Sequence, residues 1–163
     1  MTMDAGVGGR PEGGSGVLGV GGVVGVGGVV GIGGVVGIGV DAVDVTRFRA
    51  VLDRRPRLAE RIFSDGERAD ASAWRDPAER LAARFAAKEA VMKALGSGLG
   101  SFGLRDVEVV RHPGTGALAG APSLRLRSAA AALARDRGVT RWHVSLTHTA
   151  QLAVALVVAE GGR

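Results

Sequence analysis

The segment from Asp76 to Gly96 constrains the fold most, because its sequence is typical of one long helix with defined ends. Asp76 can cap the first turn, Pro77 suits the first helical position, and Glu79 can reach back to the cap. Gly96 can end the helix in a left-handed conformation. The apolar side chains that recur at helical spacing are Leu81, Phe85 and Met92. The sequence therefore predicts a helix that buries this face.

A carboxylate and a lysine stand beside the apolar face of this helix. Glu89 lies four residues after Phe85, and Lys93 lies one turn further on. A carboxylate that loses water needs a cation, which is either Lys93 or an ion bound from outside. An ordinary surface pair between Glu89 and Lys93 fits the spacing equally well. The helix alone does not choose between these interpretations.

Composition restricts the class of protein and its partners. The chain has 163 residues, 46% of them hydrophobic, which suits one globular domain with a core. It has no cysteine, so disulfides and thiolate metal sites are excluded. The net charge of +5 suits an acidic protein, a phosphate-rich small molecule or a nucleic acid. With 4% aromatic residues, a base-stacking surface is disfavoured.

The N-terminal part consists of repeats. One glycine-valine hexapeptide occurs three times over residues 19–36, and a fourth copy becomes Gly37-Ile38-Gly39-Val40-Asp41. Glycine-rich sequence orders poorly, so we expect 1–36 to be a disordered extension without catalytic residues and 37–163 to be one domain. Residues 17–40 are too rich in glycine for a membrane span, and no basic run marks a signal peptide. We expect a soluble, cytoplasmic protein with no membrane or nucleic-acid partner.

Apolar periodicity predicts mixed helices and strands. We expect a short buried strand at 36–41, irregular structure at 66–75, and an antiparallel sheet packed against the long helix. This is an α+β arrangement. Besides the long helix, helices are predicted at 45–52, 58–63 and 128–137, and strands at 107–110, 124–126, 142–147 and 152–158.

Three polar residues stand out against this frame. Asp41 ends an apolar strand, Glu89 interrupts a buried stripe, and His148 follows a strand. Two carboxylates suit a hard cation such as Mg²⁺, and Lys93, with Arg84 and Lys88, could neutralise phosphate. Each residue also has a simpler interpretation, since Asp41 can cap the next helix and His148 can stabilise a turn.

In this order the motifs resemble the holo-acyl-carrier-protein synthase family, the small 4′-phosphopantetheinyl transferases. The first motif is Gly37-Ile38-Gly39-Val40-Asp41 with Arg47, the central motif spans 84–94 with Gly96-Ser97-Gly98, and the last is Val144-Ser145-Leu146-Thr147-His148. The resemblance covers essentially all of residues 37–160. It implies the small α+β phosphopantetheinyl transferase fold, assembled as a trimer with sites between subunits.

The resemblance also implies roles for the residues. Asp41 and Glu89 would bind Mg²⁺, Glu89 and Lys93 would be catalytic, and Lys93 would contact the phosphates of coenzyme A. Arg84 and His148 would meet its 3′-phosphate, and the loop of Gly96, Ser97 and Gly98 would lie along the coenzyme. The implied reaction moves 4′-phosphopantetheine from coenzyme A to a serine of an apo-acyl carrier protein, in fatty acid biosynthesis, and releases 3′,5′-ADP.

The implied protein partner is acidic, which matches the basic charge. Arg47, Arg54 and Arg57 stand at positions that the family uses to bind its carrier protein. Two rival hypotheses are a carrier-binding module without catalysis, which the intact Asp41, Glu89 and Lys93 disfavour, and a nucleic-acid binder, which the lack of a recognition motif disfavours.

Overall fold

The computed structural model describes residues 34–98, 100–112, 115, 117 and 119–162. Nearly all of the extension predicted at 1–36 lies outside these residues. The elements, in chain order, are β1 (Val35–Asp44), α1 (Val45–Arg54), α2 (Arg57–Ile62), α3 (Asp65–Ser72), α4 (Pro77–Ala94), a 3-10 turn η1 (Leu104–Asp106), β2 (Val107–Arg111), β3 (Pro122–Leu126), α5 (Ser128–Asp136), β4 (Val139–His148) and β5 (Leu152–Gly161).

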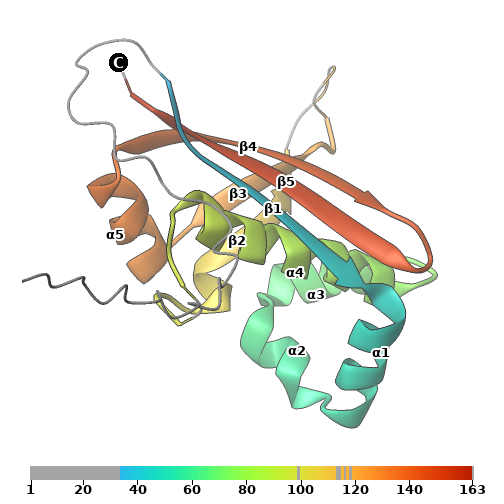
Figure 1. Ribbon diagram of the computed structural model, residues 1–163. Helices are drawn as coiled ribbons and strands as arrows, with labels where there is room; N and C mark the ends of the chain where they lie inside the picture. The colour runs from blue at the N-terminus through green and yellow to red at the C-terminus, as the bar shows by residue number, and fades with distance from the viewer. Residues whose placement is uncertain (1–33, 99, 113–114, 116, 118, 163) are drawn as a thin grey trace, which may run out of the picture.

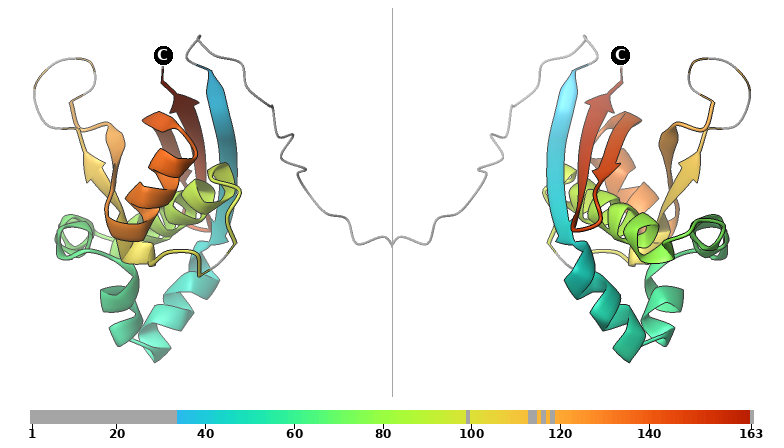
Figure 2. Two further views of the ribbon diagram at one scale, coloured as in Figure 1. Left: turned by 90° about the vertical axis from the view of Figure 1, so that its left-hand side faces the viewer. Right: turned by 90° about the vertical axis from the view of Figure 1, so that its right-hand side faces the viewer.

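Two antiparallel sheets surround the long helix α4 (Figure 1). The larger sheet has the strand order β1-β5-β4, and β2 pairs with β3 in a separate hairpin. Figure 2 shows the described helices gathered on one side of the larger sheet. The predicted α+β fold with a central helix is therefore confirmed.

Strand β1 packs directly on the backbone of α4. A Cβ atom built on Gly37 would lie 1.9 Å from the carbonyl oxygen of Ala94, and one on Gly39 would lie 1.8 Å from that of Ala90. Small side chains also line β5 on this inner face, where Ala153, Ala155, Val157 and Ala159 are fully buried. The glycines of the first motif thus allow the sheet to approach the helix closely.

Two sequence expectations about β1 and the following region were wrong. The strand predicted as short and buried runs for ten residues, and its outer face carries Ile38 and Val40, which are 60% and 50% exposed. Most of the segment predicted as irregular, 66–75, belongs to α3, because Ser64 and Glu67 make a capping box at the start of that helix. The sequence Ser64-Asp65-Gly66-Glu67 carried that signal.

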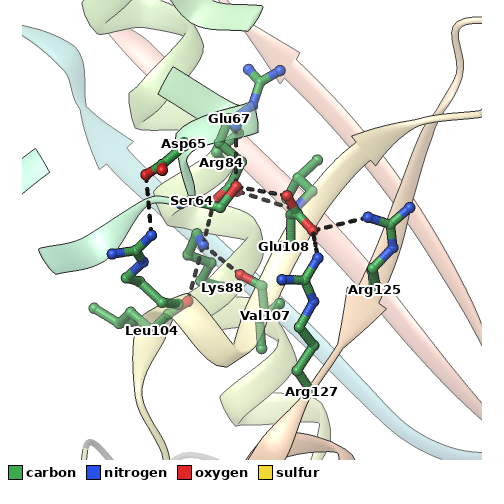
Figure 3. A network of polar contacts seen from close by, with 12 residues as sticks. Ser64, Asp65, Glu67, Arg84, Lys88, Leu104, Val107, Glu108, Arg125 and Arg127 are labelled. Atoms are coloured by element: carbon green, nitrogen blue, oxygen red, sulfur yellow. Dashed lines mark hydrogen bonds and ion pairs between the residues drawn. The ribbon is translucent and has the colours of Figure 1, made fainter. Parts of the chain in front are cut away.

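A buried polar network joins α3, α4 and the hairpin (Figure 3). Lys88 is fully buried and donates to Glu67 at 2.8 Å, and to the backbone oxygens of Leu104 and Val107. Glu67 also accepts from the backbone N–H groups of Ser64 and Val109. The expectation that Lys88 neutralises phosphate was wrong, because its ammonium is enclosed on the α3 side of α4.

Within the described part of the chain, the helices are all too short or too polar to span a bilayer.

Candidate active site

Asp41 and Lys93 meet where β1 crosses the C-terminal half of α4. Strand alternation places Asp41 on the same inner face as Gly37 and Gly39. The Nζ atom of Lys93 lies 2.8 Å from Oδ1 of Asp41 and donates a second bond of 2.8 Å to the oxygen of Val40. The N-cap of α1 is Asp44 and not Asp41, so Asp41 is free of the capping role that the sequence left open.

Glu89 lies next to this pair but outside it. Its Oε1 atom is buried without a hydrogen-bond partner, and no ion pair joins Glu89 to Lys93 among the described residues. Burial raises the pKa of Glu89, the nearby charge of Asp41 raises it further, and Lys93 opposes both effects. Lys93 therefore pairs with Asp41 and not with Glu89, and Oε1 of Glu89 is left without a hydrogen-bond partner.

These two carboxylates fit a divalent cation with hard oxygen ligands. Oε1 of Glu89 lacks a hydrogen-bond partner and the charge of Asp41 acts on this carboxylate, so a bound cation would neutralise both groups. The described residues hold no cluster of three or more His, Asp or Glu side chains suited to a metal. Magnesium commonly takes one or two carboxylates and completes its coordination with water and phosphate.

Arg84 and His148 line one pocket together, at a different place on the molecule. The guanidinium of Arg84 is held by Asp70 of α3, and Nδ1 of His148 lies 3.6 Å from the carboxylate of Glu79. Burial lowers the pKa of Arg84, an effect that Asp70 opposes. The lining also includes Arg80 and Arg111, and its three arginines outnumber the neighbouring carboxylates of Asp70 and Glu79, so the pocket suits an anion. The carboxylate of Glu79 lies beside His148, and among the described contacts at the start of α4 Asp76 accepts from the N–H groups of Ala78 and Glu79 without the predicted reciprocal bond to Glu79.

The glycine loop continues from the end of α4 that carries Lys93. Gly96 has a φ of 59°, and the backbone N–H of Ser97 donates to the oxygen of Met92, which closes the helix as the sequence predicted. A Cβ atom on Gly98 would meet nothing within 4 Å. Neither this loop nor Asp41, Glu89 and Lys93 contribute to the lining of the Arg84 pocket. The predicted coenzyme residues thus form two separate groups in one chain.

The three predicted docking arginines lie on the first two helices. Arg47 and Arg54 are exposed on α1, and Arg57 is exposed at the start of α2. These helices extend from the end of β1, beyond the larger sheet (Figure 1). The arginines are thus available to a partner.

The model of the 4′-phosphopantetheinyl transferase superfamily matches residues 37–157. The chain belongs to this superfamily. A holo-[acyl-carrier-protein] synthase of Frankia alni is 51% identical over 122 residues, which cover 75% of this chain and 94% of that protein. The corresponding protein of Beutenbergia cavernae is 48% identical over 122 residues, with 75% and 95% coverage. The chain is therefore an enzyme, a phosphopantetheinyl transferase of the holo-acyl-carrier-protein synthase type.

Solved structures of this transferase family share the fold. The holo-acyl-carrier-protein synthase of Bacillus anthracis, crystallised with coenzyme A (3′,5′-ADP), has a TM-score of 0.62 and 32% identity, and covers 78% of this chain and 98% of its own. The acyl carrier protein synthase of Mycobacterium tuberculosis has a TM-score of 0.58 and 36% identity, with 79% and 100% coverage. The fold expected from the resemblance is confirmed.

Some residues at or beside the Arg84 pocket were missed from the sequence. Asp70 holds Arg84 and also accepts a 2.8 Å bond from Arg111, which comes from β2. Arg80 lies 3.7 Å above the ring of Trp74 at the rim of the same region. No spacing rule connects α3, β2 and α4, so only the folded arrangement brings these side chains together.

Proposed function

We propose that this enzyme transfers 4′-phosphopantetheine from coenzyme A to a serine of an apo-acyl carrier protein and releases 3′,5′-ADP, in a Mg²⁺-dependent reaction. The observation that carries the proposal is the buried, unsatisfied Oε1 of Glu89 beside Asp41, with Lys93 bonded to Asp41. Such a site is built for a cation and a phosphate together. The relatives that share the sequence are named for making holo-acyl carrier protein.

In this proposal, Asp41 and Glu89 hold Mg²⁺ through their carboxylates. When bound, the metal supplies neutralisation of charge on the phosphate oxygens. Lys93 binds a phosphate oxygen and stabilises the charge that develops as the serine oxygen attacks the β-phosphorus. The bond from phosphorus to the oxygen of the departing 3′,5′-ADP then breaks. Glu89 helps to remove the serine proton, directly or through water.

Arg84 and His148 bind the 3′-phosphate of the coenzyme in this proposal. The pocket that they share brings together Arg80, Arg84, Arg111 and His148, and its charge suits a phosphate. The loop of Gly96, Ser97 and Gly98 lies beside the rest of the coenzyme, since it follows directly from the helix end that carries Lys93.

We propose that the site is completed between subunits of a homotrimer. The metal residues and the Arg84 pocket do not share a lining within one chain, so one coenzyme would use residues of two copies. The outer face of the larger sheet exposes Ile38, Val40, Leu152 and Leu156, between 42% and 60% each. An apolar sheet face of this kind suits burial against a second copy.

The carrier protein would dock on α1 and α2 through Arg47, Arg54 and Arg57. Acidic helices of the carrier would be attracted over a distance and then held by these exposed cations. We also propose that the reaction takes place in the cytoplasm and belongs to fatty acid biosynthesis.

Mass spectrometry of the carrier tests the function. The full chain is incubated with coenzyme A, Mg²⁺ and apo-acyl carrier protein, and the carrier is weighed before and after. We expect a gain equal to one phosphopantetheine group and none when EDTA replaces Mg²⁺. A folded enzyme that leaves the mass of several apo-carriers unchanged would refute the proposal.

A further inference from the structure

We infer that Lys93 is a built-in competitor of the metal: it neutralises Asp41 in the coenzyme-free enzyme, and metal binding releases its ammonium for the phosphate. The inference rests on the proposed function, because it assigns the order in which two cations use Asp41. It concerns an exchange of partners by Lys93. A lysine that served only as a phosphate ligand would not need this exchange.

The contacts of Lys93 show what it does before the metal arrives. Its Nζ atom donates to Oδ1 of Asp41 and to the oxygen of Val40, each at 2.8 Å. The ammonium therefore uses two of its three donors on β1. In this position it occupies Oδ1, one of the two oxygens through which Asp41 would bind the metal.

The exposure of the two partners makes the exchange feasible. The Lys93 side chain is 54% exposed, whereas that of Asp41 is only 18% exposed. Asp41 is thus fixed against the sheet, while Lys93 sits on a flexible four-carbon stem at the solvent side. The lysine is the partner that can leave.

The charges favour the exchange once a dication is present. Asp41 and Glu89 together carry two negative charges when ionised, and the single ammonium of Lys93 bonds to only one of them. A divalent cation matches the pair better and repels the nearby ammonium. Lys93 then swings toward the Gly96 loop, one turn beyond it on the chain, where the proposed coenzyme phosphates lie.

The inference predicts that removal of the Lys93 ammonium strengthens metal binding and abolishes phosphopantetheine transfer. The test is titration of the coenzyme-free full chain with Mn²⁺, followed by calorimetry and by the electron paramagnetic resonance signal of free Mn²⁺. We expect Lys93→Met to bind Mn²⁺ about threefold to tenfold more tightly than wild type, because a partly exposed ion pair no longer has to be broken. Lys93→Arg keeps the competing charge and should bind Mn²⁺ close to wild type or more weakly.

Arg61→Met is the matched control for net charge. Arg61 is exposed on α2, and its removal changes the total charge by the same amount as Lys93→Met. We expect its Mn²⁺ affinity to stay close to that of wild type. If both variants gained affinity equally, the effect would be one of net charge and the inference would fail.

The outcomes separate this inference from the proposed function. Unchanged or weaker Mn²⁺ binding by folded Lys93→Met, in an enzyme whose wild type modifies the carrier, would overturn the exchange and leave the function intact. A wild type that binds Mn²⁺ but modifies no carrier would overturn the function alone. If circular dichroism shows Lys93→Met to be unfolded, the Mn²⁺ affinity of Lys93→Gln is measured in its place.

Discussion

The Cα atom of Gly39 faces the carbonyl oxygen of Ala90 so closely that a Cβ atom at Gly39 would lie 1.8 Å from that oxygen. No flexible side chain can move aside there, because the contact is with helix backbone. The approach of β1 to α4 brings Asp41 beside Glu89 and Lys93. A single missing carbon atom therefore supports the geometry of the proposed metal site.

Gly39→Ala tests this contact. We expect a loss of about 3 kcal/mol in the free energy of unfolding, since the added methyl group forces strand and helix apart. Activity should fall as well, because Asp41 moves with its strand. Urea denaturation measures the stability. Gly103→Ala is the control, because its Cβ atom would make only ordinary contact, at 3.7 Å from the nearest atom of Asp106, and a near-native midpoint is expected for it.

Glu89→Gln tests the cost of the unsatisfied carboxylate. The folded-state pKa of Glu89 is raised, chiefly by burial, so the folded protein binds more protons than the unfolded chain between the two pKa values. Stability from this group therefore falls as the pH rises through that window. We expect metal-free Glu89→Gln to be more stable than wild type at pH 7, with the difference vanishing below the ordinary glutamate pKa, and to lose transfer activity. Thermal melts at several pH values measure this, and a constant difference at all pH values would contradict it.

Arg47→Glu tests the docking helices. Reversing this exposed charge should raise the KM for an acidic carrier about tenfold and leave the KM for coenzyme A nearly unchanged, because only the carrier meets α1. Steady-state kinetics with each substrate varied in turn measures both constants. Arg135→Glu makes the same change on exposed α5, at the other end of the molecule from α1 (Figure 1). Equal effects of the two variants would show that net charge and not the docking face is responsible.

Ile38→Asp tests the outer face of the larger sheet. Ile38 is 60% exposed beside other apolar side chains, so a buried charge there should prevent assembly. We expect light scattering after gel filtration to report a trimer for wild type and a monomer for the variant. Ala129→Asp introduces the same charge at an exposed position of α5 and should leave the oligomeric state unchanged. A trimeric Ile38→Asp protein would place the interface elsewhere.

Lys88→Met tests the buried network of Figure 3. The change leaves the fully buried Glu67 without its cation, which we expect to cost about 3 to 5 kcal/mol in the free energy of unfolding. Adding Glu67→Gln should recover part of that loss, because no charge is left unpaired, although the amide oxygen keeps only one of the two backbone bonds that the carboxylate oxygens accept. Denaturant midpoints of the single and double variants measure the recovery. A double variant as unstable as the single one would show that packing and not charge is lost.

The sequence predicted the long helix and most strands, because these follow from local spacing. Asp76, Pro77 and Gly96 mark the helix ends independently of the rest of the fold. The start of α3 was equally local, and the pattern from Ser64 to Glu67 would have predicted it. The exposure of Ile38 in the single chain was not predictable. A strand has the same apolar pattern whether its outer face packs against its own chain or against another one.

For the candidate site, too, some features could be predicted from the sequence and others could not. The family resemblance implied that Asp41, Glu89 and Lys93 would act together, and the structure brings them together. Spacing did not predict which carboxylate Lys93 would meet, because that choice depends on how β1 crosses α4. For Lys88 the sequence expectation was wrong. Its position on the helix was compatible with a phosphate contact, but the tertiary fold buries its ammonium against Glu67.

The glycine contacts of β1 also bear on how the strand finds its place. Six residues before Gly37 and Gly39 the chain repeats the same spacing in Gly31 and Gly33, so a missing Cβ by itself does not identify one register. What the repeats lack is an acid two residues later, where Asp41 meets Lys93. The ion pair between Asp41 and Lys93 therefore distinguishes the native register of β1 from one shifted by six residues.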